Sequence, residues 1–171
     1  MFNEINELKL FFEDCYRQVS VREYARLMKV APATASTLLK EYSKSGYLKK
    51  KEERRHLLFS LNNGNKKAID LSRLYWKEKL KDLVDSISKN TVNSSIVLFG
   101  SLSKAEATPE SDIDLAVFAP EKKNIDLSKM EKKLGRKISV YWFKSSSDVK
   151  NEHLLNNILN GVILSGRIKW R

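Results

Sequence analysis

Two short apolar segments constrain this chain more than any other feature. A Gly-Ser pair follows the first segment, and an Asp-x-Asp pair lies at the start of the second. The first segment, residues 95–99, is rich in β-forming residues and is stopped by Gly100-Ser101. The second, residues 111–118, contains Asp112 and Asp114, two positions apart. Strand residues at positions i and i+2 point to the same face, so this pattern predicts a β-hairpin with both carboxylates on one face.

The residue types at the ends of these two predicted strands indicate a site for a phosphorylated ligand and a cation. A glycine lets backbone amides approach a ligand closely, and a serine hydroxyl adds a donor, so Gly100-Ser101 predicts a phosphate-binding turn. Two carboxylates that point together repel each other unless a cation neutralises them. Asp112 and Asp114 are therefore candidate catalytic residues and ligands for Mg²⁺ or Mn²⁺ bound to a triphosphate. A solvated acidic turn is the alternative, and it leaves both flanking apolar strands as a coincidence.

The spacing Gly100-Ser101-x10-Asp112-x-Asp114 resembles the signature of the polymerase-beta-like nucleotidyltransferases, and is most similar to their minimal archaeal and bacterial members. The resemblance extends over residues 91–168. It implies a fold in which Gly100-Ser101 holds a nucleoside triphosphate (NTP) and the paired aspartates hold metal ions. An acceptor group then attacks the α-phosphate and pyrophosphate is released. Lys104 is a further candidate for contact with phosphate.

Two positions depart from the pattern of these minimal enzymes. Ala105 stands where a glycine is usual. The family also carries a third carboxylate on a strand that follows a short helix. We expect that helix at 127–134 and that strand at 138–143, and strand alternation then puts Ser139 at the acidic position. A serine supplies neither negative charge for a metal nor a general base.

Three interpretations of the missing carboxylate stay open. The domain is a slow transferase, or one completed by an acceptor or partner chain. It is a sensor that binds nucleotide and metal without turnover. In the third interpretation the strand alignment is shifted, and another carboxylate such as Asp126 or Asp148 completes the site.

The first half of the chain has a different pattern, in which predicted helices are followed by a basic hairpin. Apolar helical faces are expected at 4–15, near 21–28 and at 32–45. Two β-type runs then flank a charged tip at 49–55. This order resembles the winged helix-turn-helix family of DNA-binding domains over residues 4–62.

The winged-helix resemblance implies that the third helix enters the major groove of double-stranded DNA and that the hairpin contacts phosphate. The outward-facing candidates are Thr34, Ser36, Thr37, Lys40, Lys49, Lys50, Lys51, Arg54 and Arg55. A net charge of +11, from 32 Lys and Arg against 21 Asp and Glu, also favours a polyanionic partner. Such domains also serve as protein-docking modules, and Glu52 and Glu53 dilute the basic patch, so that alternative stays open.

A helical segment joins the two halves. Residues 66–88 carry an apolar face broader than one small domain needs, so we expect one long helix that packs both halves together or forms a homodimer contact. The expected protein is α+β. It has a three-helix winged helix at 1–64, a connecting helix and linker at 65–90, and a mixed-sheet nucleotidyltransferase-fold domain at 91–171.

Composition narrows the class further. The hydrophobic and charged fractions, 42% and 31%, are ordinary for a globular protein. The single cysteine, Cys15, excludes an intrachain disulfide and is expected to be a small buried side chain. The sequence shows no signal-peptide pattern and no apolar run of the ~18 residues that a membrane helix needs, so we expect a cytoplasmic protein with no membrane partner. Basic residues also surround Trp170, namely Arg167, Lys169 and Arg171, and suggest a basic tail.

These features favour an Mg²⁺-dependent nucleotidyltransferase with a DNA-binding N-terminal domain. It would move a nucleoside monophosphate (NMP) group from an NTP to a protein or small-molecule acceptor. The alternative is a DNA-binding transcriptional regulator whose transferase-like domain binds nucleotide with little or no turnover. The intact hairpin favours the first hypothesis, and Ser139 favours the second.

Overall fold

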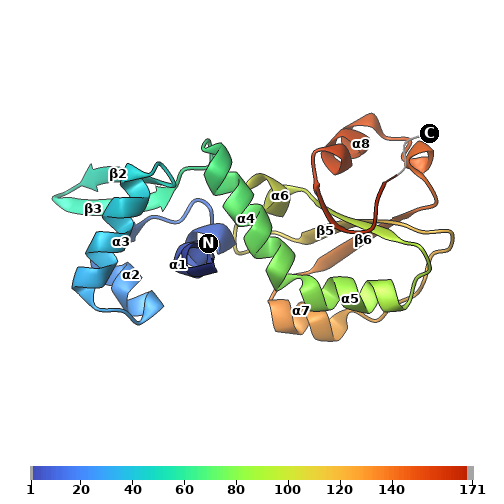
Figure 1. The fold of residues 1–171 in the computed structure, drawn as a ribbon, viewed down its shortest axis with the longest axis horizontal. Coiled ribbons are helices and arrows are strands. Elements are labelled where there is room, and N and C mark those ends of the chain that lie inside the picture. Colours follow the sequence, from blue (N-terminus) through green and yellow to red (C-terminus); the bar gives the residue numbers. More distant parts are fainter. Residues whose placement is uncertain (1, 169–171) are drawn as a thin grey trace. The chain divides into compact units, whose positions relative to one another are not determined.

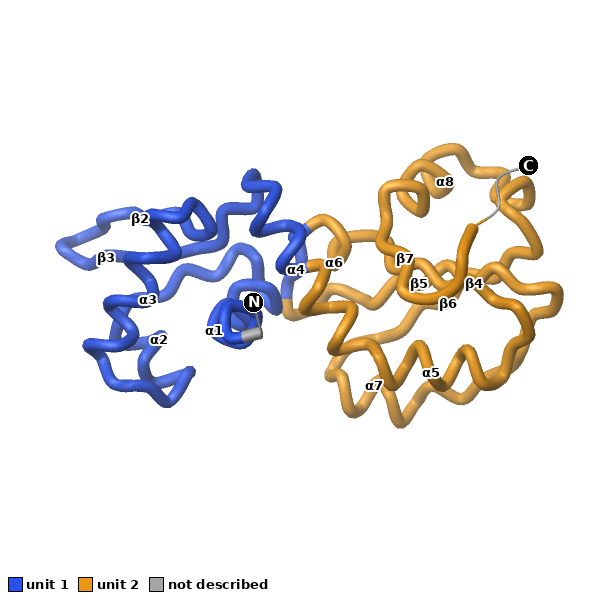
Figure 2. Tube along the Cα trace, in the orientation of Figure 1, with its two compact units in different colours: residues 1–72, 105–108 blue, residues 73–104, 109–171 orange. Residues whose placement is uncertain are grey.

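The structure, a computed structural model, describes residues 2–168 and has an α+β architecture (Figure 1). Two compact units divide the chain (Figure 2). One holds the residues up to Ser72 together with Ala105–Thr108, and the other holds Arg73–Lys104 and the residues from Pro109 onward. Lys169, Trp170 and Arg171, from the expected basic tail, lie outside the described residues. Within the described range, no helix combines the length and apolar content needed to cross a membrane.

The N-terminal unit combines three helices with a three-stranded antiparallel sheet (Figure 1). In chain order its elements are α1 (Phe2–Glu13), β1 (Val19–Ser20), α2 (Val21–Met28), α3 (Pro32–Lys44), β2 (Leu48–Glu53) and β3 (His56–Leu61). The strands lie in the order β1-β3-β2, with Val19 opposite Phe59 and Leu48 opposite Leu61. The helices expected at 4–15 and 32–45 are therefore present, with slightly different ends.

Two buried tyrosines tie α2 and α3 to α1 through a single residue, Glu7. The Tyr24 hydroxyl donates to the Glu7 carbonyl oxygen at 2.8 Å, and the Tyr42 hydroxyl donates to the Glu7 carboxylate. Burial, followed by the Glu7 charge, raises the pKa of Tyr24 to about 12. Burial and the hydrogen bond to Glu7 raise the pKa of Tyr42 as well. Cys15 is buried in the same unit, as expected.

The basic hairpin differs from the charged tip expected at 49–55. Residues 49–53 belong to strand β2, and only Arg54-Arg55 form the turn, because Glu53 lies opposite His56. Both arginines have positive φ angles, 47° and 64°. This is the type I′ conformation, which favours Asn-Gly and costs about 1–2 kcal/mol for each residue that carries a Cβ. The turn is therefore strained.

The prediction of a single helix over 66–88 is wrong, because the structure has two helices there. Helix α4 (Lys66–Lys79) ends before Leu80, whose φ and ψ are −91° and 3°, and α5 (Lys81–Lys89) follows. Leu80 is fully buried, as are Trp76 before it and Ile87 after it, so the apolar face continues through the break. Neither glycine nor proline marks the position, and periodicity alone therefore predicts one helix.

The C-terminal unit is built on a four-stranded mixed sheet in the order β6-β5-β4-β7. Its strands are β4 (Ser95–Phe99), β5 (Ile113–Phe118), β6 (Ile138–Phe143) and β7 (Val162–Ser165), and its remaining helices are α6 (Ser101–Lys104), α7 (Ser128–Leu134) and α8 (Glu152–Leu159). β4 is antiparallel to β5 and β7, whereas β5 and β6 are parallel. Figure 1 shows α8 on one side of this sheet and α5 and α7 on the other.

The two central strands, β4 and β5, explain the apolar runs of the hairpin. Both strands are almost wholly buried. Val97, Phe99, Ala116 and Phe118 form one core cluster with Ile158 of α8. Helices therefore cover the hairpin strands, and only the strand ends offer polar groups to a ligand.

Candidate functional site

The predicted hairpin is present, and it brings its four candidate residues to one end of the sheet. β4 ends at Phe99, which lies opposite Asp114 on β5. Gly100 follows β4 directly, and Ser101 begins α6. Asp112 comes one residue before β5, and both aspartates are half-buried. The turn and the carboxylates, separated by ten residues in sequence, are therefore neighbours in space.

Gly100 and Asp114 approach each other so closely that a side chain at position 100 would displace the Asp114 carboxylate. The φ angle of Gly100 is +73°, and a Cβ built there would lie 2.5 Å from Oδ2 of Asp114. A side chain at this position would therefore be strained by its backbone and would collide with the carboxylate. The glycine leaves open the space beside the carboxylate that a phosphate and a cation would share.

The charge state of Asp114 reflects its surroundings. Burial raises the pKa of this carboxyl group, and the charge of Asp112 raises it further. The two carboxylates are thus close enough to repel each other in a partly desolvated setting. A hard divalent cation such as Mg²⁺ prefers oxygen ligands of this kind and would relieve the repulsion, so the donor set fits the metal that the sequence predicts.

Within the part of the chain that the structure describes, no third acidic residue joins this pair. Among residues 2–168, the structure contains no group of three His, Cys, Asp or Glu side chains arranged to hold a metal ion. β6 runs beside β5, and Ser139 lies opposite Asp114, which is the neighbouring position expected for a third carboxylate. Ser139 is half-buried there.

The two other carboxylates considered from sequence lie elsewhere. Asp126 is exposed and accepts a hydrogen bond from the Ser128 backbone amide at 3.0 Å, at the start of α7. Asp148 follows the far end of β6 and accepts hydrogen bonds from the backbone amides of Lys144 and Ser145, at 3.1 and 2.9 Å. Both carboxylates organise local turns, and neither reaches the aspartate pair.

Lys104 is held at the end of α6. Its ammonium group donates to Oδ1 of Asn157 on α8 at 2.8 Å, and its side chain is half-buried. Asn157 had not been predicted as a site residue, because an asparagine within a helix gives no distinctive signal in sequence. The hydrogen bond fixes the ammonium group of Lys104, three residues after Ser101, against α8.

Two further residues support the Gly100-Ser101 turn, and sequence reasoning missed both. The Arg73 guanidinium donates through Nε to the Ser103 carbonyl oxygen at 2.8 Å. The Ser103 hydroxyl, fully buried, donates to the Gly100 carbonyl oxygen at 2.8 Å. This chain of hydrogen bonds ties the turn to helix α4.

Ala105 is the first position that departs from the family pattern. Its φ angle is 56°, in the left-handed region, and its side chain is fully buried. Glycine adopts this conformation without strain, whereas alanine does not. The substitution therefore adds strain to the loop but leaves Gly100 and the aspartates in place.

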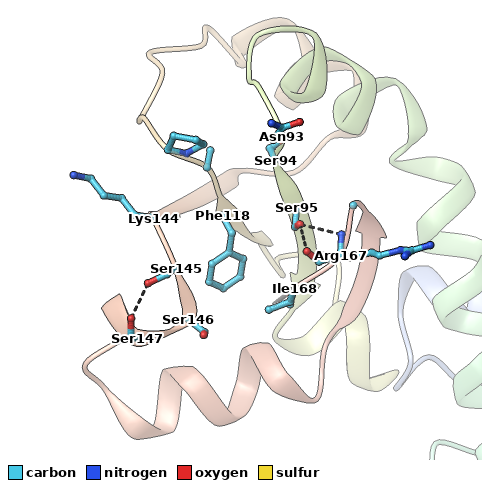
Figure 3. Close-up of a pocket in the computed structure, with 13 residues that line it drawn as sticks. Asn93, Ser94, Ser95, Phe118, Lys144, Ser145, Ser146, Ser147, Arg167 and Ile168 are labelled. Carbon is cyan, nitrogen blue, oxygen red and sulfur yellow. Dashed lines mark hydrogen bonds between the residues drawn. The ribbon is translucent and has the colours of Figure 1, made fainter. Parts of the chain in front are cut away.

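A cavity of about 950 Å³ opens at the opposite end of the sheet (Figure 3). Phe118 lies within it, and the Lys144 and Arg167 side chains extend outward from opposite sides. The Ser95 hydroxyl donates to the Arg167 carbonyl oxygen at 2.7 Å and accepts from its amide at 3.0 Å. None of the residues predicted to bind nucleotide lines this cavity, since it lies at the other ends of β4 and β5.

The nucleic-acid candidates of α3 and the hairpin lie on the surface of the N-terminal unit. On α3, Thr34, Thr37 and Lys40 are exposed, and Ser36 is half-buried. All five basic candidates of the hairpin are exposed: Lys49, Lys50, Lys51, Arg54 and Arg55.

The hairpin cations do not share one face. Lys50 lies opposite the buried Phe59, so Lys49 and Lys51 point to the other side of β2. Lys51 also forms an ion pair with Glu53 at 3.1 Å. The basic patch is therefore divided between two faces and the turn.

Comparison with known proteins finds a similarity, which lies in the C-terminal part of the chain. Residues 77–159 match the family model of the nucleotidyltransferase domain, and the matched span includes the hairpin and Ser139. No curated protein matches the chain. Residues 77–159 are therefore similar to a nucleotidyltransferase domain, and the match includes no part of α1–α3 or β1–β3.

Proposed function

We propose that this protein binds an NTP with Mg²⁺ or Mn²⁺ and transfers its NMP group to a protein or small-molecule acceptor. One observation carries the proposal: Gly100 lies directly against the Asp114 carboxylate, at the strand ends of a nucleotidyltransferase domain. The turn that offers hydrogen-bond donors to phosphate thus lies beside the carboxylates that can bind a cation. A metal-bound triphosphate requires both groups together.

Each candidate residue has a role in this proposal. Gly100, Ser101 and Lys104 bind and orient the triphosphate, and Asp112 with Asp114 holds the cation. A bound divalent cation neutralises charge on the triphosphate. The acceptor oxygen or nitrogen then forms a bond to the α-phosphorus, the bond from that phosphorus to the bridging oxygen breaks, and pyrophosphate leaves. The proton of the attacking acceptor group passes to solvent or to a base that belongs to the acceptor molecule, since Ser139 is no base at neutral pH.

A second candidate function is a regulator that binds nucleotide and turns it over slowly or not at all. The position of Ser139 favours this candidate, because it lies opposite Asp114 where a third carboxylate would complete the metal site. Both candidates predict nucleotide binding that depends on Asp112 and Asp114. They differ only in whether a covalent product accumulates.

For the N-terminal unit we propose a winged helix that binds double-stranded DNA. The proposal is supported by the element order α1-β1-α2-α3-β2-β3, the strand order β1-β3-β2, and the exposed residues of α3. α3 would enter the major groove and the hairpin would contact phosphates. The strained Arg54-Arg55 turn fits this role, because function is a common reason for keeping arginines in an unfavourable conformation.

Label transfer tests the catalytic proposal. The protein is incubated with each α-labelled NTP, Mg²⁺ or Mn²⁺ and cell lysate, beside Asp112→Ala/Asp114→Ala. Transfer by the wild type and not by the double variant supports the enzyme. If both proteins bind nucleotide equally and neither transfers label, the enzyme hypothesis and the sensor hypothesis are both wrong.

A mobility-shift assay over a salt series tests the DNA proposal. Binding is expected to weaken steeply with salt, and each lost phosphate contact lowers the log–log slope by about 0.9. Replacing the hairpin cations Lys49, Lys50, Lys51, Arg54 and Arg55 with glutamine should flatten the slope. An unchanged slope would remove the hairpin from the DNA contact.

A further inference from the structure

A buried arginine lies behind the carboxylate pair. Arg136 follows α7 and precedes β6, and only 8% of its surface is exposed. Burying a guanidinium group is unfavourable unless hydrogen bonds and ring contacts compensate for the lost water. An arginine in this position therefore needs a structural or functional reason.

The contacts of Arg136 lead directly to the aspartate strand. Nη1 donates to the carbonyl oxygen of Ser111, the residue before Asp112, at 2.7 Å. The next residue along, Lys137, accepts a hydrogen bond through its carbonyl oxygen from the Ile113 amide at 2.8 Å. The peptide groups on both sides of Asp112 are thus held by the segment that contains Arg136.

The guanidinium group is itself held in place. It lies over the ring of the fully buried Trp76, 5.1 Å from the ring centroid. The Arg136 amide donates to the Glu131 carbonyl oxygen at 3.3 Å, and the Glu131 carboxylate accepts from the Ile138 amide at 2.9 Å. Both ends of the side chain are therefore fixed, so its direction toward Ser111 is well defined.

We propose that Arg136 is a positioning residue for the metal–nucleotide site, which fixes Asp112 beside Asp114 by holding the Ser111 carbonyl. The inference rests on the proposed nucleotide-binding function. The arginine does not touch the ligand; it sets the distance between the two carboxylates against their mutual repulsion. Outer partners of this kind typically change metal affinity by about 10–100-fold when they are removed.

The variants separate positioning from packing. Arg136→Met keeps an apolar side chain over Trp76 and loses the donor, whereas Arg136→Lys keeps a charge with a shorter reach. Lys79→Met is the matched control, because the Lys79 ammonium also lies 5.1 Å from the Trp76 centroid, on α4. Ile87→Val, at a fully buried position in α5, lowers stability away from the hairpin and controls for that effect.

The measurement is the affinity of full-length protein for Mn²⁺ with a non-hydrolysable NTP analogue, by calorimetry and by the Mn²⁺ resonance spectrum, together with the melting temperature. We expect Arg136→Met to bind about tenfold more weakly or worse, and Arg136→Lys to be intermediate. Lys79→Met and Ile87→Val should bind like the wild type. If Arg136→Met does not fold, Arg136→Lys carries the test.

Two other results would overturn the inference in distinguishable ways. If Arg136→Met binds as the wild type does, or if Ile87→Val loses affinity in step with its melting temperature, Arg136 has only a packing role. If the wild type binds no Mn²⁺–nucleotide, or Asp112→Ala/Asp114→Ala binds equally well, the proposed function fails and the inference fails with it.

Discussion

At the scale of single residues, the site depends on a glycine and an aspartate that meet. Gly100 has no side chain, and a Cβ added there would lie 2.5 Å from the Asp114 carboxylate. That carboxylate is partly desolvated and repelled by Asp112, so its ionised form is unfavourable without a cation. The arrangement that suits a bound cation therefore lowers the stability of the folded protein when no cation is bound.

Replacing Gly100 tests the contact directly. Gly100→Ala should lose about 1–2 kcal/mol of stability through its positive φ angle, and should also abolish metal–nucleotide binding by displacing Asp114. Gly135→Ala is a matched control, because its φ angle is +66° and an added Cβ meets nothing within 4 Å. Chemical denaturation and nucleotide titration of both variants provide the comparison. Equal binding by the two would mean that the space beside Asp114 is not used.

The raised pKa of Asp114 predicts a pH-dependent stability difference. As pH rises from acidic values, the unfolded chain releases the Asp114 proton first, while the folded chain retains it longer. Without divalent cations the wild type therefore loses stability relative to Asp114→Asn, and the loss is complete above the raised pKa. Thermal melting of both proteins at several pH values measures the difference. Asp126→Asn should show the opposite sign, because hydrogen bonds from Ser128 lower the pKa of Asp126. A wild type that gains stability relative to Asp114→Asn as pH rises would contradict this account.

Ser139→Asp tests the account of the missing carboxylate. Ser139 lies opposite Asp114 on the parallel strand, so an aspartate there would complete an acidic triad. We expect tighter Mn²⁺ binding and faster label transfer than in the wild type. Without metal we expect a lower melting temperature, because a third negative charge adds repulsion. Unchanged metal affinity would show that this position does not face the metal site.

At the scale of elements, the Arg54-Arg55 turn lowers the stability of the hairpin while it supplies two cations for the proposed DNA binding. Both residues have positive φ angles in a two-residue turn. Arg54→Asn/Arg55→Gly should raise stability by about 1–2 kcal/mol by supplying residues that this turn prefers. The same change should weaken DNA binding and reduce its salt dependence. Stronger DNA binding by this variant would exclude the turn from the interface.

The secondary structure of the chain could be predicted where local chemistry decides it. β4, β5 and β6, for example, coincide with short apolar runs: β4 ends just before Gly100, β5 begins just after Asp112, and β6 ends at Phe143. The break at Leu80 could not be predicted, because it has no glycine or proline and the apolar face runs through it. Residues 49–53 looked like a loop because they are charged, but pairing with β3 makes them a strand.

At the scale of the whole molecule, the candidate site was predictable only in its inner part. Gly100, Ser101, Asp112 and Asp114 were predicted from spacing, and Ser139 from strand alternation. The residues that support them were not predicted. Arg73, Arg136 and Asn157 act through contacts between segments distant in sequence. Ser103 contacts Gly100 from only three residues away, but its residue type gives no distinctive signal.

The affinity for Mn²⁺ with a non-hydrolysable NTP analogue, measured by calorimetry on the full chain, tests the central claim most directly. The account predicts saturable binding by the wild type, loss of that binding in Asp112→Asn/Asp114→Asn, and unchanged binding in Asp126→Asn, whose carboxylate lies at the exposed start of α7. Binding that survives the double substitution, or no binding by the wild type, would contradict the assignment of this hairpin as a metal–nucleotide site.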